Sequence, residues 1–453
     1  MSWQEKYKNK LITARQAAAL VTSGADVLIS LMDQPKDIVL EIANRHQELS
    51  NVTLTSHWVE DYPFLHPEQH PEMEKAFLVK DPMPVRYTRE ALRGKRIDWQ
   101  PTAFGLSNGE RQILEDRGRL YHYKDFFFFK ITPPDDDGNC SFGPHPWFTP
   151  SACRTAKVKI AEIDPALPRV YGEYVNLDEI DYLVEAQPVA RFRAEDRFVP
   201  MPAPGEWEIA QVIGANAASL VNDGDTIEIG VGTASEAVMD FLVDRNDLGI
   251  DTEVIYYQVI DLIERGVVTG KKKSVDTGKV VSACLQIHDP DDPHSTHAIE
   301  YVTQNPMFEF RDISTMCNVP RIAAQDNMVA INNILTVDLL GQVVITHLGT
   351  TPISGPGGQV EYCIGAHYSR GGRSIAMLSS TALGGKVSRI VPRFEAGAVV
   401  MLPMVYLDYL VTEHGIANLS CKSQRERAEA LISVAHPDFQ PELQKAAREM
   451  FYP

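Results

Sequence analysis

Two stretches of similar sequence, 200 residues apart, set the strongest limit on the fold of this chain. Each stretch passes from an apolar segment that ends at glycine to a β-prone run and then to a helix-like segment. The segments are ALVTSG (19–24), VLIS (27–30) and KDIVLEIAN (36–44), and SLVNDG (219–224), TIEIG (226–230) and SEAVMDFLV (235–243). A shared order of elements at a fixed offset indicates an internal repeat. We therefore predict two similar domains related by duplication.

The length of the chain and one proline-rich segment place the boundary between these domains. A chain of 453 residues is too long for one ordinary core. The segment VPMPAPGE (199–206) holds three prolines and a glycine, and such a segment continues neither a helix nor a central strand. We take it as the linker and expect domains over residues 1–198 and 206–453.

Apolar runs in both halves indicate the kind of sheet. Four of them are FFFFKIT (126–132), KVKIAEI (157–163), KVVSACL (279–285) and GAVVMLP (397–403). Such runs suit strands covered on both faces, as in mainly parallel sheets with helices packed against them. The expected fold class is α/β, with an open sheet in each domain. The four phenylalanines are interpreted as a buried strand, and a ligand pocket is the alternative.

Charge, hydropathy and cysteines narrow the class of protein. A formal net charge of −18 disfavours nucleic acid and anionic membranes as partners, since both bind clustered Lys and Arg. No stretch approaches 18 uninterrupted apolar residues, so no membrane span is expected. Six scattered cysteines without a C-x-x-C pair, and a start without an apolar signal-like stretch, are typical of a cytoplasmic protein with reduced thiols. The segment HDPDDPH (288–294) has unpatterned carboxylates among prolines, so we expect a solvated loop and no metal site.

The segment DTIEIGVGTASEAVMDFLV (225–243) is the first with chemical content. A predicted strand leads into the glycines Gly230 and Gly232, and a helix follows with Thr233 or Ser235 as its N-cap. Glycines at such a junction let a ligand approach the backbone, and the helix N-terminus offers N–H groups to an anion or a polarised carbonyl. The pattern is neither G-x-G-x-x-G nor a P-loop, so an ordinary strand-to-helix turn stays an alternative.

A more specific motif occupies residues 247–281, DLGIDTEVIYYQVIDLIERGVVTGKKKSVDTGKVV. It closely resembles the segment around the catalytic glutamate of family I coenzyme A-transferases of the acetyl-CoA hydrolase/transferase type, which include 4-hydroxybutyrate CoA-transferases. The family's G-I-H-T-E and V-x-T-G-x-K-K stand here as GIDTE (249–253) and VTGKKK (268–273). Six further family blocks match in order along nearly the whole chain: PPDDDGNCSFG (133–143), MVAINNILTVDLLGQV (328–343), SGPGGQVEY (354–362), SRIVP (388–392), VTEHGIANL (411–419) and AHPDFQPEL (435–443).

The resemblance implies a fold, a reaction and a set of site residues. The family fold is two similar open-sheet α/β domains, the CoA-transferase fold, and members are commonly homodimers or larger. Glu253 would be the covalent nucleophile, forming a glutamyl-CoA thioester with ping-pong kinetics. The CoA-binding residues would be Gly230, Val231, Gly232, Thr233, Ala234, Gly357 and Gly358. CoA enters as a substrate together with a short carboxylic acid, and no permanently bound cofactor is expected.

Only the matching frame distinguishes Glu253 from the other acidic residues. The chain has 61 of them, and a glutamate is usually a solvated surface group. The lysines at 271–273 would attract CoA phosphates or form a solvated turn.

Two positions depart from the family pattern. Asp251 stands where the family has a histidine, two residues before the nucleophile. Leu383, in SSTALGGK, replaces the lysine of S-T-A-K-G-G, with Lys386 or Arg389 as candidate substitutes for its contact with CoA.

The first domain carries the residues that we expect to select the acid. His145, Trp147 and Phe148 follow SFG and would line a bulky pocket, an ordinary packed loop being the alternative. The whole chain looks most similar to bacterial itaconate CoA-transferases, which pass CoA to itaconate from succinyl-CoA or acetyl-CoA. The alternatives are 4-hydroxybutyrate or another short acid, an acyl-CoA hydrolase, and a non-catalytic CoA-binding relative. A sugar-phosphate isomerase-like enzyme with a related sheet has no support from the matched blocks.

Overall fold

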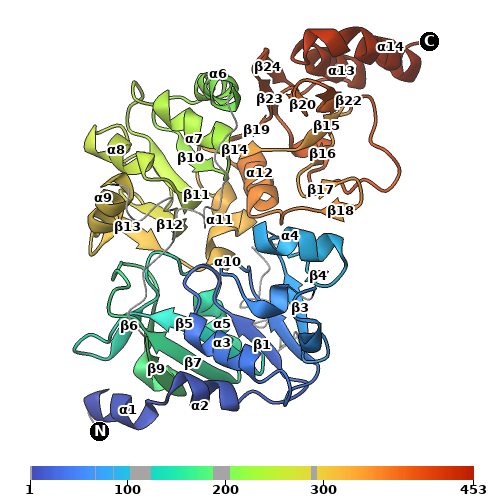
Figure 1. The fold of residues 1–453 in the computed structure, drawn as a ribbon. Coiled ribbons are helices and arrows are strands. Elements are labelled where there is room, and N and C mark those ends of the chain that lie inside the picture. Colours follow the sequence, from blue (N-terminus) through green and yellow to red (C-terminus); the bar gives the residue numbers. More distant parts are fainter. Residues whose placement is uncertain (1–2, 67, 85, 103–123, 187–204, 287–292) are drawn as a thin grey trace. The chain divides into compact units, whose positions relative to one another are not determined.

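The computed structural model of the chain forms two compact units (Figure 1). The residues that it describes are 3–66, 68–84, 86–102, 124–186, 205–286 and 293–453. The first unit consists of Met1–Phe198, Ala283–Thr315 and Ile353–Gly355, and the second of Val199–Ser282, Met316–Pro352 and Pro356–Pro453. The predicted linker at 199–206 lies outside the described residues except for its last two, so the domain boundaries at 198 and 206 stay a prediction.

Among the described residues, seven strands form a parallel sheet in the order β4-β3-β2-β1-β5-β7-β9. They are β1 (Asp26–Ile29), β2 (Val52–Thr55), β3 (Phe77–Asp81), β4 (Asp98–Trp99), β5 (Phe126–Ile131), β7 (Val158–Ile163) and β9 (Tyr182–Glu185). The accompanying elements are α1 (Trp3–Lys10), α2 (Ala14–Ala19), α3 (Lys36–Asn44), α4 (Arg86–Arg93), α5 (Thr149–Thr155), β6 (Asn139–Ser141) and β8 (Tyr174–Asn176). The core joins α2, α3 and one face of this sheet.

A second sheet has the order β13-β12-β11-β10-β14-β19-β23-β24 over the described residues. Its strands are β10 (Thr226–Ile229), β11 (Gly249–Ile255), β12 (Val280–Leu285), β13 (Phe308–Phe310), β14 (Met328–Asn333), β19 (Arg373–Met377), β23 (Tyr409–Thr412) and β24 (Gly415–Asn418). The central strands pair in parallel, and β24 is antiparallel to β23. The chain passes from the second unit to the first within β12.

Helices and short strand pairs complete the fold. The helices are α6 (Glu206–Ala218), α7 (Thr233–Asp240), α8 (Gln258–Glu264), α9 (Pro293–Val302), α10 (Ile313–Met316), α11 (Val319–Ala323), α12 (Gln359–Tyr368), α13 (Gln424–Ser433) and α14 (Gln440–Phe451). The short strands are β15 (Thr336–Asp338), β16 (Val343–Val344), β17 (His347–Leu348), β18 (Thr351–Pro352), β20 (Thr381–Ala382), β21 (Val387–Ser388) and β22 (Ile390–Val391).

The two sheets share one topology, which confirms the predicted duplication. In each, the first strand lies near the middle, the next three follow on one side and the later strands follow on the other. The repeated turns are also alike, since Gly24 and Gly224 both have a φ of +78°, a left-handed conformation that favours glycine. Arg45 and Arg245 each donate hydrogen bonds to two carbonyl oxygens just before that turn.

Three of the four apolar runs hold strands, namely β5, β7 and β12, as predicted. The strand predicted over GAVVMLP (397–403) is wrong. This segment is a loop, and its backbone pairs with β16 only through an isolated β-bridge between Leu402 and Val343. Val400 is 38% exposed, so the run lacks the cover on both faces that would favour a strand.

The described residues also bear on thiols, membranes and metals. All six cysteines are free thiols, and five of them are buried. No helix in the described part of the chain is long and apolar enough to cross a membrane. No group of His, Cys, Asp and Glu within the described ranges could hold a metal ion, and most of HDPDDPH (288–294) lies outside those ranges.

Candidate active site

Glu253 lies on β11, a strand in which every residue is buried. Side chains alternate along a strand, so Glu253 and Asp251 face the same side of the sheet. The hydroxyl of Ser282 on β12 donates a 3.0 Å hydrogen bond to the carbonyl oxygen of Glu253 and fixes its backbone. A carboxylate in such a strand loses most of its hydration, so its partners decide its charge.

The Glu253 carboxyl accepts a hydrogen bond from a backbone N–H. The N–H of Gly358 donates to Glu253 Oε2 over 2.5 Å. Burial raises the pKa of Glu253 to about 8, the hydrogen bond from Gly358 acts against this rise, and the nearby carboxylate of Glu361 adds to it. The carboxyl is therefore desolvated, and its burial favours the neutral form.

Glycine is required at the positions that face this carboxyl. Gly358 immediately precedes α12, so its N–H is one of the helix N-terminal donors that have no partner within the helix. A Cβ atom at Gly358 would lie 2.5 Å from Cys317 Sγ and 2.7 Å from Glu253 Oε2. Gly357 has a φ of +58°, and a Cβ there would lie 3.4 Å from Glu253 Oε2. Gly357 and Gly358, which the sequence predicts to bind CoA, thus both lie beside the Glu253 carboxyl.

The second glycine segment, Gly230 to Ala234, joins β10 to α7 next to β11. The hydroxyl of Tyr256 donates to Gly230 O over 3.0 Å and accepts from Gly232 N over 3.1 Å. Asn333 Nδ2 donates to the carbonyl oxygen of Val231 over 3.1 Å. The end of β11 and the end of β14 thus hold this loop, in which Val231, Thr233 and Ala234 accompany the glycines.

The predicted N-cap of α7 is wrong. The helix begins at Thr233, so Gly232 is the N-cap, and no side chain caps it. Gly232 has a φ of +145°, a conformation that favours glycine. Thr233 and Ser235 both lie within the helix, so neither is its N-cap. The first turn of α7 therefore keeps backbone donors free of a side-chain cap.

Two buried carboxyls near Glu253 were not predicted from the sequence. Glu228 on β10 is 1% exposed and accepts a 2.7 Å hydrogen bond from Asn332 Nδ2. Burial raises the pKa of Glu228 well above its usual range, and the nearby Glu253 adds to this rise. Glu361 lies in the first turn of α12. A single glutamate in the apolar run TIEIG was the available signal for Glu228.

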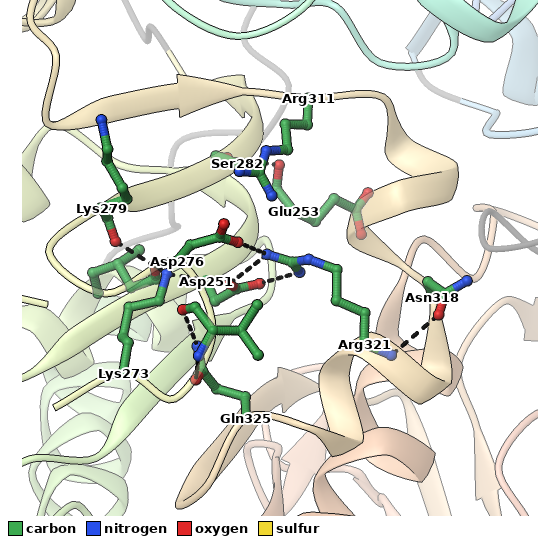
Figure 2. A network of polar contacts seen from close by, with 12 residues as sticks. Asp251, Glu253, Lys273, Asp276, Lys279, Ser282, Arg311, Asn318, Arg321 and Gln325 are labelled. Atoms are coloured by element: carbon green, nitrogen blue, oxygen red, sulfur yellow. Dashed lines mark hydrogen bonds and ion pairs between the residues drawn. The ribbon is translucent and has the colours of Figure 1, made fainter.

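Asp251, which stands where the family has a histidine, lies against two cationic side chains in the structure. Asp251 is paired with Lys273 and Arg321 (Figure 2). The Lys273 side chain is 0% exposed, so neither prediction for the lysines at 271–273 holds for this residue. Leu383 is exposed with a φ of +53°, and nothing in the structure explains why leucine stands there.

The acid-selecting candidates belong to the first unit. His145 Nδ1 lies 2.8 Å from Asp33 Oδ2, and His145 Nε2 lies 2.8 Å from the carbonyl oxygen of Leu285. Both ring nitrogens therefore face protein acceptors, so a substrate carboxylate would have to displace one of them. Trp147 and Phe148 are buried, and Trp147 has a φ of +44°, a strained conformation of the kind that functional loops often keep.

Comparisons with known proteins agree with this geometry. Residues 1–191 match the acetyl-CoA hydrolase/transferase N-terminal domain, and residues 295–447 match the C-terminal domain. A 4-hydroxybutyrate coenzyme A transferase of Clostridium kluyveri is 34% identical over 463 residues, which cover 100% of both chains. The chain belongs to the acetyl-CoA hydrolase/transferase family.

Other members of the acetyl-CoA hydrolase/transferase family extend the comparison. A succinyl-CoA:cyclohexane-1-carboxylate CoA transferase of Geobacter metallireducens is 30% identical over 99% of this chain and 97% of its own. The crystal structure of RipA from Yersinia pestis has a TM-score of 0.86 at 30% identity, covering 100% of both chains. The structure of a 4-hydroxybutyrate CoA-transferase from Porphyromonas gingivalis has a TM-score of 0.77 at 29% identity, covering 99% of this chain and 100% of its own. The protein is accordingly a CoA-transferase with the two-domain fold of that family.

Proposed function

We propose that this CoA-transferase moves CoA from an acyl-CoA to a short carboxylic acid through a glutamyl-CoA thioester on Glu253. The observation that carries the proposal is the buried Glu253 carboxyl, with Oε2 2.5 Å from the Gly358 nitrogen. A carboxylate needs no base to become a nucleophile, but it is a weak one in water. Desolvation makes the carboxylate more reactive, and a backbone N–H stabilises the negative charge that develops on oxygen during the reaction.

The chemistry proceeds by exchange at two carbonyl groups. The Glu253 carboxylate attacks the acyl-CoA carbonyl, the C–S bond breaks, and an acyl-glutamyl anhydride and CoA thiolate result. The thiolate then attacks the glutamyl carbonyl, which releases the first acid and leaves CoA on Glu253 as a thioester. An incoming acid repeats both steps in reverse and leaves as the new acyl-CoA. The first acid departs before the second binds, so the kinetics are ping-pong.

The Gly358 N–H has a role at each attack on the glutamyl carbonyl. When Glu253 reacts through Oε1, Oε2 becomes the carbonyl oxygen of the anhydride and of the thioester. Negative charge grows on Oε2 when a thiolate or carboxylate adds to that carbonyl, and the N–H already faces this atom. One such donor typically contributes a factor of about 10²–10³ in rate.

Incubation with an acyl-CoA and no acceptor acid should trap CoA on Glu253. Without an acceptor the cycle stops after the first acid leaves, so the glutamyl-CoA thioester accumulates. Peptide mass spectrometry should find CoA, less one water, on the peptide that contains Glu253, and the Glu253→Gln variant should show none. Steady release of free CoA without any adduct, measured by thiol titration, would instead identify a hydrolase.

For the acceptor we propose itaconate. The overall resemblance of the chain to itaconate CoA-transferases supports this choice, and His145, Trp147 and Phe148 are the candidate residues for its pocket. The second candidate is 4-hydroxybutyrate, because the relative from Clostridium kluyveri that bears this name spans the whole chain.

A panel of acids should separate these candidates. With succinyl-CoA or acetyl-CoA as donor, kcat/KM for itaconate should exceed that for 4-hydroxybutyrate, butyrate and acetate by at least about tenfold, the discrimination expected of a pocket fitted to one small group. If 4-hydroxybutyrate instead has the highest kcat/KM of the panel, that acid becomes the proposed acceptor.

A further inference from the structure

A buried ion network lies on the same face of β11 as Glu253. Arg321 holds Asp251 through two parallel hydrogen bonds, Nη1 to Oδ1 and Nη2 to Oδ2, each of 2.7 Å. Lys273 Nζ lies 3.2 Å from Asp251 Oδ2, and Arg321 also donates to Asp276 Oδ2 over 2.8 Å. Figure 2 shows the guanidinium of Arg321 reaching from α11 to both carboxylates.

The network is buried, and its positive and negative charges are equal in number. The side chains of Lys273 and Asp251 are 0% and 3% exposed. Burial acts to raise the pKa of Asp251, but Lys273 and Arg321 beside it hold that pKa below its usual range. Two cations face two carboxylates, so the network adds little net charge, and any effect on Glu253 is one of geometry. Pairs buried to this degree are weak sources of stability, which leaves specificity of position as a reason for the arrangement.

Local sequence accommodates the buried lysine. A Cβ atom at Gly249 would lie 2.5 Å from Lys273 Cγ, so the glycine makes room for the lysine stem. Lys273 Nζ also donates to the carbonyl oxygens of Ile250 over 2.9 Å and Lys279 over 3.0 Å. The motif residues Gly249, Asp251 and Lys273 are thus parts of one contact.

A chain of contacts joins this network to the donor of Glu253. Arg321 lies on α11, which packs against α12. The packing is close at Gly365, where a Cβ atom would collide with the side chain of Ile322. The N-terminus of α12 presents Gly358, whose N–H holds Glu253. The strand with the nucleophile and the helix with its donor are therefore tied together through Asp251 and Arg321.

We infer that Asp251 and Arg321 are positioning residues, whose ion pair sets the Gly358 N–H against Glu253 Oε2. The inference rests on the proposed nucleophilic role of Glu253. A displacement of about 1 Å at such a site can cost about 10²-fold in rate, because the reacting groups then leave their productive geometry.

The groups facing Glu253 determine the sign of the expected pH effect. They come from three elements and one connecting segment: Glu228 on β10, Tyr256 at the end of β11, Glu361 on α12 and Cys317 before α11. These four are acids, and the hydrogen bond from the Gly358 N–H favours the ionised form of Glu253. Loss of its alignment raises the pKa of Glu253 further and moves the acid limb of kcat/KM to higher pH.

The test compares Asp251→Asn, Arg321→Met and Arg321→Lys with a matched control. The Arg373–Asp225 pair lies in the same unit with side chains 14% and 4% exposed, against 14% and 3% for Arg321 and Asp251. In Asp251→Asn and Arg321→Met, kcat should fall about 10- to 100-fold with little change in the KM for acyl-CoA. In Arg321→Met the acid limb of kcat/KM should rise by about one pH unit, the size expected for a weakened hydrogen bond to a charged group.

The control variant and the conservative variant exclude a purely structural role. Arg373→Met should lower the melting temperature but keep the wild-type acid limb. Arg321→Lys keeps the positive charge but loses the two-point contact with Asp251. Its kcat and the acid limb of its kcat/KM should therefore lie between those of the wild type and Arg321→Met. It replaces Arg321→Met as the test variant where Arg321→Met fails to fold. Wild-type pH profiles in Arg321→Met and Arg321→Lys would overturn the positioning role. Activity in Glu253→Gln would instead overturn the proposed nucleophile, so the two failures are distinguishable.

Discussion

Replacing Glu253 by glutamine is expected to lower kcat/KM for CoA transfer by at least about 10⁴-fold, the scale of loss when a covalent nucleophile is removed. Glutamine keeps the shape of the side chain and an oxygen for the Gly358 N–H, so the fold and the site remain. The lost property is the carboxylate that, in the proposed mechanism, attacks the thioester. Steady-state rates with an acyl-CoA and an acceptor acid measure the effect.

The same variant should be more stable than the wild type at alkaline pH. The pKa of Glu253 is about 8 in the folded chain against 4.5 for the free group, so the folded state favours the neutral acid. That favourable difference is complete below pH 4.5 and is lost as the pH rises through 8, where the buried carboxylate ionises. Removing the charge should then raise the free energy of unfolding at pH 9 by on the order of 5 kcal/mol, with little change at pH 4.

Denaturant unfolding at the two pH values checks this result, with Glu449→Gln as the control. Glu449 is an exposed residue of α14, so its replacement should leave stability almost unchanged at both pH values. An inactive Glu253→Gln that is also less stable at pH 9 would mean that the carboxyl is not held in the desolvated state described above.

The fold could be predicted, and Glu253 and Gly358 could be singled out as candidate site residues, because their signals are local. The duplicated helix, turn and strand segments extend over consecutive residues, and so do the frames around Glu253 and Gly358. The strand predicted over 397–403 failed for a different reason. Apolar content alone does not show whether a run is covered, and Val400 is 38% exposed.

The supporting residues could not be predicted because their contacts join distant parts of the sequence. Arg321 and Asp251 are 70 residues apart, and Asn332 and Glu228 are 104 apart. The order of strands in the sheet and the packing of α11 on α12 bring them together, and no spacing in the sequence encodes this. The departure at Asp251 was visible in the sequence, but its cationic partners were not.

Replacing Gly358 by alanine is expected to lower kcat/KM by about 10²–10³-fold, mainly through kcat, the usual effect of losing one oxyanion donor. The backbone accepts alanine, since Gly358 has a φ of −87°. The obstacle is the methyl group, which would lie 2.5 Å from Cys317 Sγ and 2.7 Å from Glu253 Oε2. The Glu253 side chain must therefore move away from the N–H that stabilises its oxygen.

A double-mutant cycle with Cys317→Ala separates the steric effect from general damage. The single Cys317→Ala variant should keep activity within about tenfold of wild type, since the thiol takes no part in the proposed chemistry. In the double variant the methyl group at 358 can shift into the space left by Sγ, so part of the lost rate should return. Full additivity of the two losses would mean that the contact at Cys317 does not limit the site. If the rate recovers in the double variant and the CoA adduct on Glu253 reappears, the loss of rate in Gly358→Ala comes from a longer distance between the Gly358 N–H and Glu253 Oε2.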